Sequence, residues 1–109
     1  MSIDIDAISK QMIKAAKGVV KDKWPATQSY FESESKAYAA RLATIVKLRK
    51  EGLISEERAK QHVTFQTNAW ETVLLSVEGL NQLLVEDALN AANKVIRDTV
   101  NKAIGFALL

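Results

Sequence analysis

Residues 55–109 read SEERAKQHVTFQTNAWETVLLSVEGLNQLLVEDALNAANKVIRDTVNKAIGFALL, and a long apolar stripe runs through them. When side chains are placed 100° apart, as in an α-helix, one set falls within a narrow sector. The set is Ala59, Val63, Trp70, Val77, Leu84, Ala88, Val95, Thr99 and Phe106. From Leu74 onward further aliphatic side chains widen the stripe, which predicts that this helix is covered on more than one side.

Gly79 allows two interpretations of this half of the chain. The stripe keeps its phase across Gly79, which favours one continuous or merely bent helix of roughly 50 residues, about 75 Å long. Alternatively the helix ends near Glu78, Gly79 takes a left-handed conformation, and Asn81 caps a new helix. Asn81 also lies on the stripe, where a polar side chain can fix the register of paired helices. The start is less ambiguous, because Ser55 is a typical N-cap.

Two shorter helices are expected before this stretch. The first is capped by Asp4 or Asp6 and runs to about Asp22. Trp24-Pro25 ends it, because the residue before a proline is disfavoured in the α conformation and proline is tolerated in a first helical turn. The second helix then runs to Glu51-Gly52, where glycine can supply a left-handed cap.

These elements predict an all-α fold in a single domain over residues 1–109. Two shorter helices would pack along a long C-terminal helix that is continuous, bent or broken at Gly79. They would cover only one side of it, and soluble monomers rarely leave so large an apolar strip exposed. We therefore expect a helical bundle completed by self-association, as a homodimer or a higher assembly. The predicted interface consists of Trp70, Leu75, Val77, Leu83, Leu84, Leu89, Ile96, Val100 and Ile104.

The chain offers little catalytic chemistry. It has no cysteine, and its one histidine, His62, has no carboxylate at the spacing of the metal-binding pairs found in helical bundles. The adjacent carboxylates Glu86-Asp87 point about 100° apart on a helix and read as solvated charge. No glycine-rich phosphate loop is present. We expect no enzymatic activity, no cofactor and no metal, and interpret Trp70 as a core anchor and Trp24 as a corner anchor.

The charge is uneven along the chain. Residues 1–50 carry ten Lys/Arg against five Asp/Glu, which gives +5, whereas residues 51–109 carry five against eight, which gives −3. Within the first helix, four lysines form a stripe opposite its apolar face. They are Lys10, Lys14, Lys17 and Lys21. Such a stripe suits either a solvated face or a helix that meets an anionic membrane or a nucleic acid.

The N-terminal residues MSIDIDAISK lack the basic and apolar regions of a secretory signal, and no run approaches the roughly 20 apolar residues of a membrane span. We therefore expect a cytoplasmic location. The expected function is that of a non-enzymatic structural or interaction module, a small subunit or adaptor. It would bind itself, or another helical protein, through the apolar face of its C-terminal helix. The alternative is a peripheral binder of an anionic membrane or nucleic acid through the lysine stripe.

Overall fold

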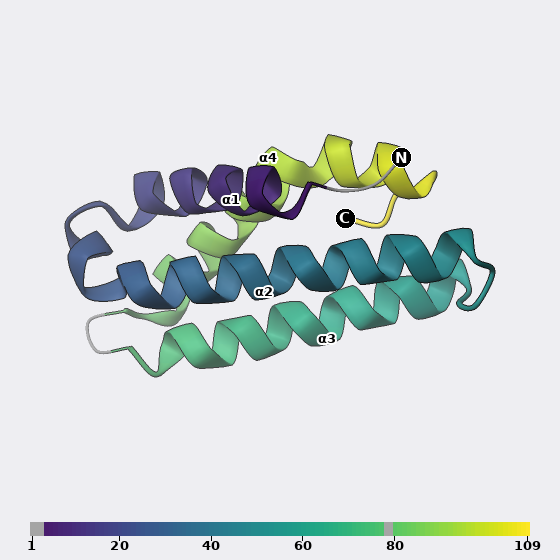
Figure 1. Ribbon diagram of the computed structural model, residues 1–109. Coiled ribbons are helices and arrows are strands. Elements are labelled where there is room, and N and C mark those ends of the chain that lie inside the picture. Colours follow the sequence, from purple (N-terminus) through teal and green to yellow (C-terminus); the bar gives the residue numbers. More distant parts are fainter. Residues whose placement is uncertain (1–3, 78–79) are drawn as a thin grey trace.

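Four α-helices account for most of the chain in the computed structural model, which describes residues 4–77 and 80–109 (Figure 1). They are α1 (Ile5–Val20), α2 (Trp24–Lys50), α3 (Glu56–Leu75) and α4 (Gln82–Ile104). A short 3₁₀ turn, Lys21–Lys23, joins α1 to α2. These described residues contain no β-strand, so the all-α prediction is confirmed.

Local capping chemistry sets the starts of α1 and α3, as the sequence predicts. The Asp4 side chain accepts a hydrogen bond from the Ala7 N–H at 3.1 Å, and the Ser55 hydroxyl accepts one from the Arg58 N–H at 3.1 Å. These bonds satisfy N–H groups that have no partner within the first turn. Pro25 lies in the first turn of α2, as expected, but the prediction that Trp24-Pro25 ends the first helix is wrong. α1 ends earlier, at Val20, where Lys21 takes a positive φ of 51°, and Trp24 is itself helical and begins α2. After α2 the backbone of Gly52 is left-handed, with φ of 71°, as expected for a glycine that follows a helix end.

The preferred prediction of one continuous C-terminal helix is wrong. α3 ends at Leu75 and α4 begins at Gln82, and the longest dimension of the molecule is 42 Å rather than about 75 Å. Asn81 is the N-cap of α4, since its side chain accepts a hydrogen bond from the Leu84 N–H at 2.8 Å. The alternative role of Asn81, as a register-fixing residue inside a seam, is therefore also wrong. The predicted left-handed cap at Gly79 lies outside the described residues.

The helices form a four-membered bundle in which successive helices run in opposite directions (Figure 1). α1 lies beside α2 and α4, and α3 also lies beside α2 and α4, so α1 and α3 occupy opposite corners. This differs from the predicted arrangement, because the C-terminal stretch forms two helices, and α1 and α2 do not lie end to end along one long helix. The reversal between α3 and α4 gives the two helices one shared core, but only α3 buries its part of the predicted stripe. On α4 the stripe prediction is wrong for Val95 and Thr99, which are exposed, because α4 instead turns the flank with Val85, Leu89 and Ile96 toward the core.

An aromatic cluster fills the part of the core between α2 and α3. The ring centroids of Trp24 and Phe31 are 5.7 Å apart, and Trp70 of α3 lies 6.4 Å from Phe31 and 5.2 Å from Tyr38. Both tryptophans are buried, Trp70 centrally and Trp24 at the corner where α1 turns into α2. Their predicted roles as core and corner anchors are confirmed.

Most of the predicted interface lies inside this core. The buried members are Trp70, Val77, Leu89, Ile96, Val100 and Ile104. Leu84 is half-buried, and only Leu75 and Leu83 are exposed. This corrects the expectation that the wide apolar face is a surface, because the chain reversal brings α4 back against α1 and α2. Self-association itself stays a prediction.

A matched pair of leucine substitutions on α4 tests this fold. Leu89 is 3% exposed and Leu83 is 69% exposed. Leu89→Asp places a carboxylate in the core and should lower the free energy of unfolding by more than about 3 kcal/mol, a large part of the total for a domain of this size. Leu83→Asp should change it by less than about 0.5 kcal/mol. Urea denaturation followed by circular dichroism measures both, and equal losses would contradict the packing of α4.

Candidate functional site

α3 has the smallest fraction of buried residues among the four helices. Its exposed side chains form a surface together with those of the neighbouring helix α2. Only four of its residues are buried: Ala59, Val63, Trp70 and Leu74. Phe65, one and a half turns before Trp70, is 69% exposed. The Phe65 ring is therefore not part of the core, and the exposed apolar surface around it is the natural candidate for a binding site.

The α2–α3 face combines one row of side chains from each helix. Helical spacing places the members of each row on one side of their helix, at intervals of three, four or seven residues. The α2 row is Tyr30, Glu34, Ala37, Arg41 and Leu48, and the α3 row is Val73, Ala69, Phe65, His62 and Arg58. α2 and α3 are antiparallel and in contact, so the two rows run side by side along the bundle.

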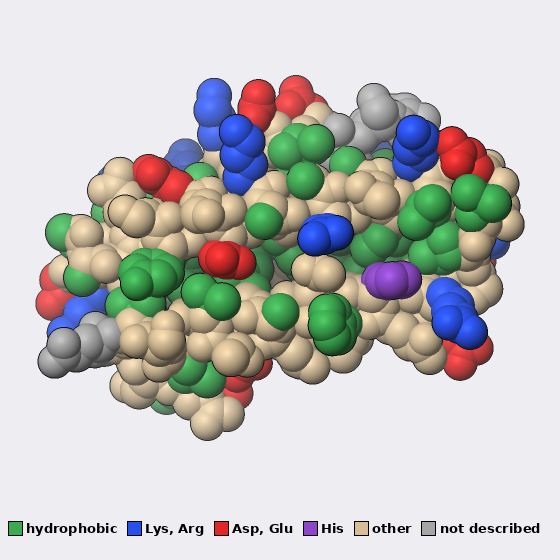
Figure 2. All heavy atoms as spheres, turned by 60° about the horizontal axis from the view of Figure 1, so that its bottom comes forward, with side chains coloured by type: hydrophobic (Ala, Val, Ile, Leu, Met, Phe, Trp, Pro, Cys, Tyr) green, Lys and Arg blue, Asp and Glu red, His purple; other side chains and the backbone are tan. Residues whose placement is uncertain are grey.

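Hollows follow the seam between the two rows, and Figure 2 shows apolar side chains in it. At one end an open hollow of about 320 Å³ is lined by Tyr30, Glu34 and Val73, with serines of α2. Toward the other end a hollow of about 520 Å³ is lined by Arg41, Phe65 and residues around them. Next to it a narrower space of about 100 Å³ reaches Ile45 and Leu48 of α2. The α2–α3 face therefore contains a groove that is lined by both apolar and polar side chains.

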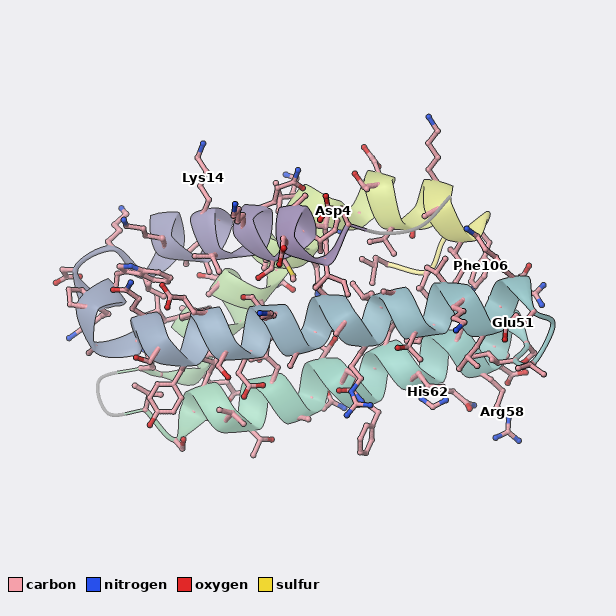
Figure 3. The ribbon with its side chains drawn as sticks, in the orientation of Figure 1. Asp4, Lys14, Glu51, Arg58, His62 and Phe106 are labelled. Carbon is pink, nitrogen blue, oxygen red and sulfur yellow. The ribbon has the colours of Figure 1, made fainter. Side chains whose placement is uncertain are left out.

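The charges of the α2–α3 face are separated along its length. Glu34 lies at the Tyr30 end, whereas Arg41 and Arg58 lie toward the α2–α3 turn, where Figure 3 shows Arg58 and His62 extending from α3. No ion pair within the described residues involves Glu34, Arg41 or Arg58. The one shown in this region joins Arg49 to Glu56 at 3.7 Å. These three charges are thus available to an external partner.

Several polar groups are buried beneath this face. The Ser35 hydroxyl, the Tyr38 hydroxyl and the Trp70 indole N–H have no hydrogen-bond partner among the described residues. Burial raises the pKa of the Tyr38 hydroxyl, and the neighbouring Thr67 side chain lowers it in part. The Tyr38 hydroxyl has no partner in ordinary hydrogen-bond geometry, so the loss of hydration on burial is the dominant cause of its raised pKa.

The sequence-predicted site residues fall in two other places. The four lysines of the predicted stripe are all exposed: Lys10, Lys14 and Lys17 on α1, and Lys21 in the 3₁₀ turn that follows it. Figure 3 shows Lys14 pointing away from the bundle. Six of the nine residues of the predicted interface are buried in the core, as described above. Sequence reasoning missed the α2–α3 face, although Tyr30 and Phe65, two aromatics placed away from the apolar faces of their helices, were a signal for it.

The described residues hold no group of three or more histidine or carboxylate side chains that could bind a metal ion. Among those same residues, no helix is both long and apolar enough to cross a bilayer. The predicted solvated carboxylates, Glu86 and Asp87, are exposed. No protein-family model, curated protein or solved structure matches this chain. The surface geometry therefore carries the functional argument.

The buried Tyr38 hydroxyl gives a prediction for stability against pH. Its raised pKa means that the folded chain keeps the phenolic proton above pH 10.0, the ordinary value, at which the unfolded chain releases it. Stability should therefore fall as the pH rises through about 10. Tyr38→Phe removes this loss, and it should also raise the free energy of unfolding at pH 7 by about 1 kcal/mol, because an unpartnered hydroxyl leaves the core.

Urea denaturation of both proteins at pH 7, 9 and 10.5 measures this difference. Tyr30→Phe is the matched control on the same helix, since Tyr30 is 45% exposed, and it should shift stability by less than about 0.5 kcal/mol. Lower stability of Tyr38→Phe at pH 7 would mean that the hydroxyl has a partner in the folded protein.

Proposed function

We propose that this chain is a non-enzymatic protein-interaction module that binds a helical surface on the α2–α3 face. The observation that carries the proposal is the exposed Phe65 side chain, which lines a hollow together with Arg41 and Arg58, and neither arginine forms an ion pair within the described residues. Interfaces are enriched in aromatic side chains and arginine, and the residues that contribute most to binding sit beside pockets. Small side chains at Ala37 and Ala69, both exposed, leave room between the two rows for a partner helix.

The proposal keeps the class of function expected from the sequence and moves its surface. The sequence placed binding on the C-terminal helix, most of whose apolar side chains are now in the core. The α2–α3 face instead carries exposed side chains, such as Tyr30 and Phe65, that a partner could contact. Rows of side chains on two adjacent antiparallel helices form a grooved surface of the kind that accepts a third helix.

Site-specific photo-crosslinking in cells tests the proposed function. A photoreactive phenylalanine analogue at position 65, and separately at position 30, should yield discrete crosslinked species. The same label at Asn90, an exposed position on α4, is the control. Mass spectrometry then identifies the attached protein, which should be the same from positions 65 and 30. Crosslinking from these positions no stronger than from position 90 would contradict the proposal.

A second candidate is the binding of an anionic surface by α1 and the 3₁₀ turn after it. The four lysines of the stripe are exposed, and all carry positive charge. None forms an ion pair within the described part of the chain, although the Lys17 ammonium lies 5.9 Å from the Trp24 ring centre. A row of ammonium groups on one helix face attracts anionic lipid or phosphate without regard to sequence.

The quadruple change of Lys10, Lys14, Lys17 and Lys21 to glutamine separates this candidate from a merely solvated face. The melting temperature should stay within a few degrees, because exposed charges contribute less than about 1 kcal/mol each. If α1 binds anions, sedimentation with vesicles rich in anionic lipid, or a mobility shift with duplex DNA, should occur at low salt for the original chain and be lost in the variant. Equal binding by the two proteins would rule out the stripe.

A further inference from the structure

The α2–α3 face is built on a central line of small side chains. Ala37 of α2 and Ala69 of α3 lie at about the same level along the bundle, because Glu34 and Val73 line one hollow, Arg41 and Phe65 line another, and the two alanines lie between these pairs. Both alanines are exposed. Small residues at the centre of a face allow another pair of helices to approach closely, and larger side chains on either side then fill the remaining space.

The larger side chains are spaced symmetrically about this line. On α3, Phe65 lies four residues before Ala69 and Val73 lies four residues after it. On α2, Glu34 and Arg41 lie seven residues apart, about 10 Å along the helix, with their midpoint between Ala37 and Tyr38. Glu34 and Arg41 therefore lie at equal distances from the centre of the face, one charge of each sign, and Arg58 lies further out, eleven residues before Ala69. Neither Glu34 nor Arg41 has an ion-pair partner within the described residues.

This symmetry makes the face complementary to itself. Consider a twofold axis that lies in the plane of the face and crosses both helices at the alanines. It places a second copy with its α2 antiparallel to the first α2, so that Glu34 meets Arg41 of the second copy and Arg41 meets its Glu34. Phe65 then meets Val73 of the second copy. A partner of uniform charge would meet a like charge at one of the two ends, which costs binding energy.

We infer that the partner of the α2–α3 face is a second copy of this chain, in an antiparallel twofold dimer centred on Ala37 and Ala69 and held in register by two Glu34–Arg41 ion pairs. The inference rests on the proposed function and names its partner. From Tyr30 to Ile45 the symmetric part of α2 is about 23 Å long, and two helices are about 20 Å wide, so each copy contributes a footprint of roughly 450 Å². That is small for a specific interface, so the dimer should be reversible at micromolar concentration.

A charge exchange between two variants tests the dimer and its register. Glu34→Arg leaves two arginines facing each other across the axis, and Arg41→Glu leaves two glutamates. Each variant alone should associate at least about a hundredfold more weakly than the original chain, because both ion pairs become like-charge contacts. In an equimolar mixture the charges are again opposite, so the two variants should form a heterodimer. Sedimentation equilibrium measures the masses against 12.1 kDa for one chain.

Circular dichroism checks that both variants remain helical. Ala37→Arg provides an independent variant that obstructs the centre of the face, with Ala7→Arg on the exposed side of α1 as its control.

The inference is supported if the original chain forms dimers, if each charge variant and Ala37→Arg are monomeric, and if the mixture of the two charge variants forms dimers again. A monomer at several hundred micromolar, or dimers that persist in both charge variants, or a mixture that stays monomeric, would overturn it. Photo-crosslinking from position 65 to a different protein, with the chain itself monomeric, would leave the proposed function standing and reject self-recognition alone.

Discussion

The contact of Trp70 with Phe31 and Tyr38 is what fixes α3 in place. α3 buries only four residues, and three of them are aliphatic side chains of ordinary size or smaller. A buried tryptophan removes roughly 150–250 Å² from water, which corresponds to several kcal/mol, so this one side chain accounts for much of the attachment of α3 to α2. It also sets the level of α3 along α2. The alignment of Ala37 with Ala69, and with it the arrangement of the α2–α3 face, depends on this ring contact.

The starts of α1 and α3 and the end of α2 were predictable because capping is local chemistry, whereas the chain reversal after α3 was not. Asp4, Ser55 and Gly52 act through hydrogen bonds or backbone preferences within a few residues. α3 buries the stripe itself, whereas α4 buries the flank that carries Val85, Leu89 and Ile96. The apolar stripe was therefore continuous along the sequence, although the buried side of α4 is not the one that the stripe marks. The informative signal was Asn81, whose side chain caps α4.

The candidate site was less predictable than the fold, because it belongs to two helices at once. Periodicity within α1 was enough to place the lysine stripe on the outside, where it lies. To predict the α2–α3 face one must know which helices are neighbours and how their residues align along the bundle, and only the tertiary packing shows this. Phe65 and Tyr30 stood out as bulky side chains off the apolar stripes, yet a single exposed aromatic is common and becomes informative only when its neighbours are known.

The seam between α1 and α4 joins the two ends of the chain, and this bears on how the bundle forms. α1 ends at Val20 and α4 begins at Gln82, so every contact between them closes a loop of more than 60 residues. Such long-range contacts form only after chain entropy has been lost, whereas the pairing of α2 with α3 requires the closure of a short turn. We therefore expect the α2–α3 hairpin to be the early folding unit and the docking of α1 onto α4 to be the step that limits the folding rate.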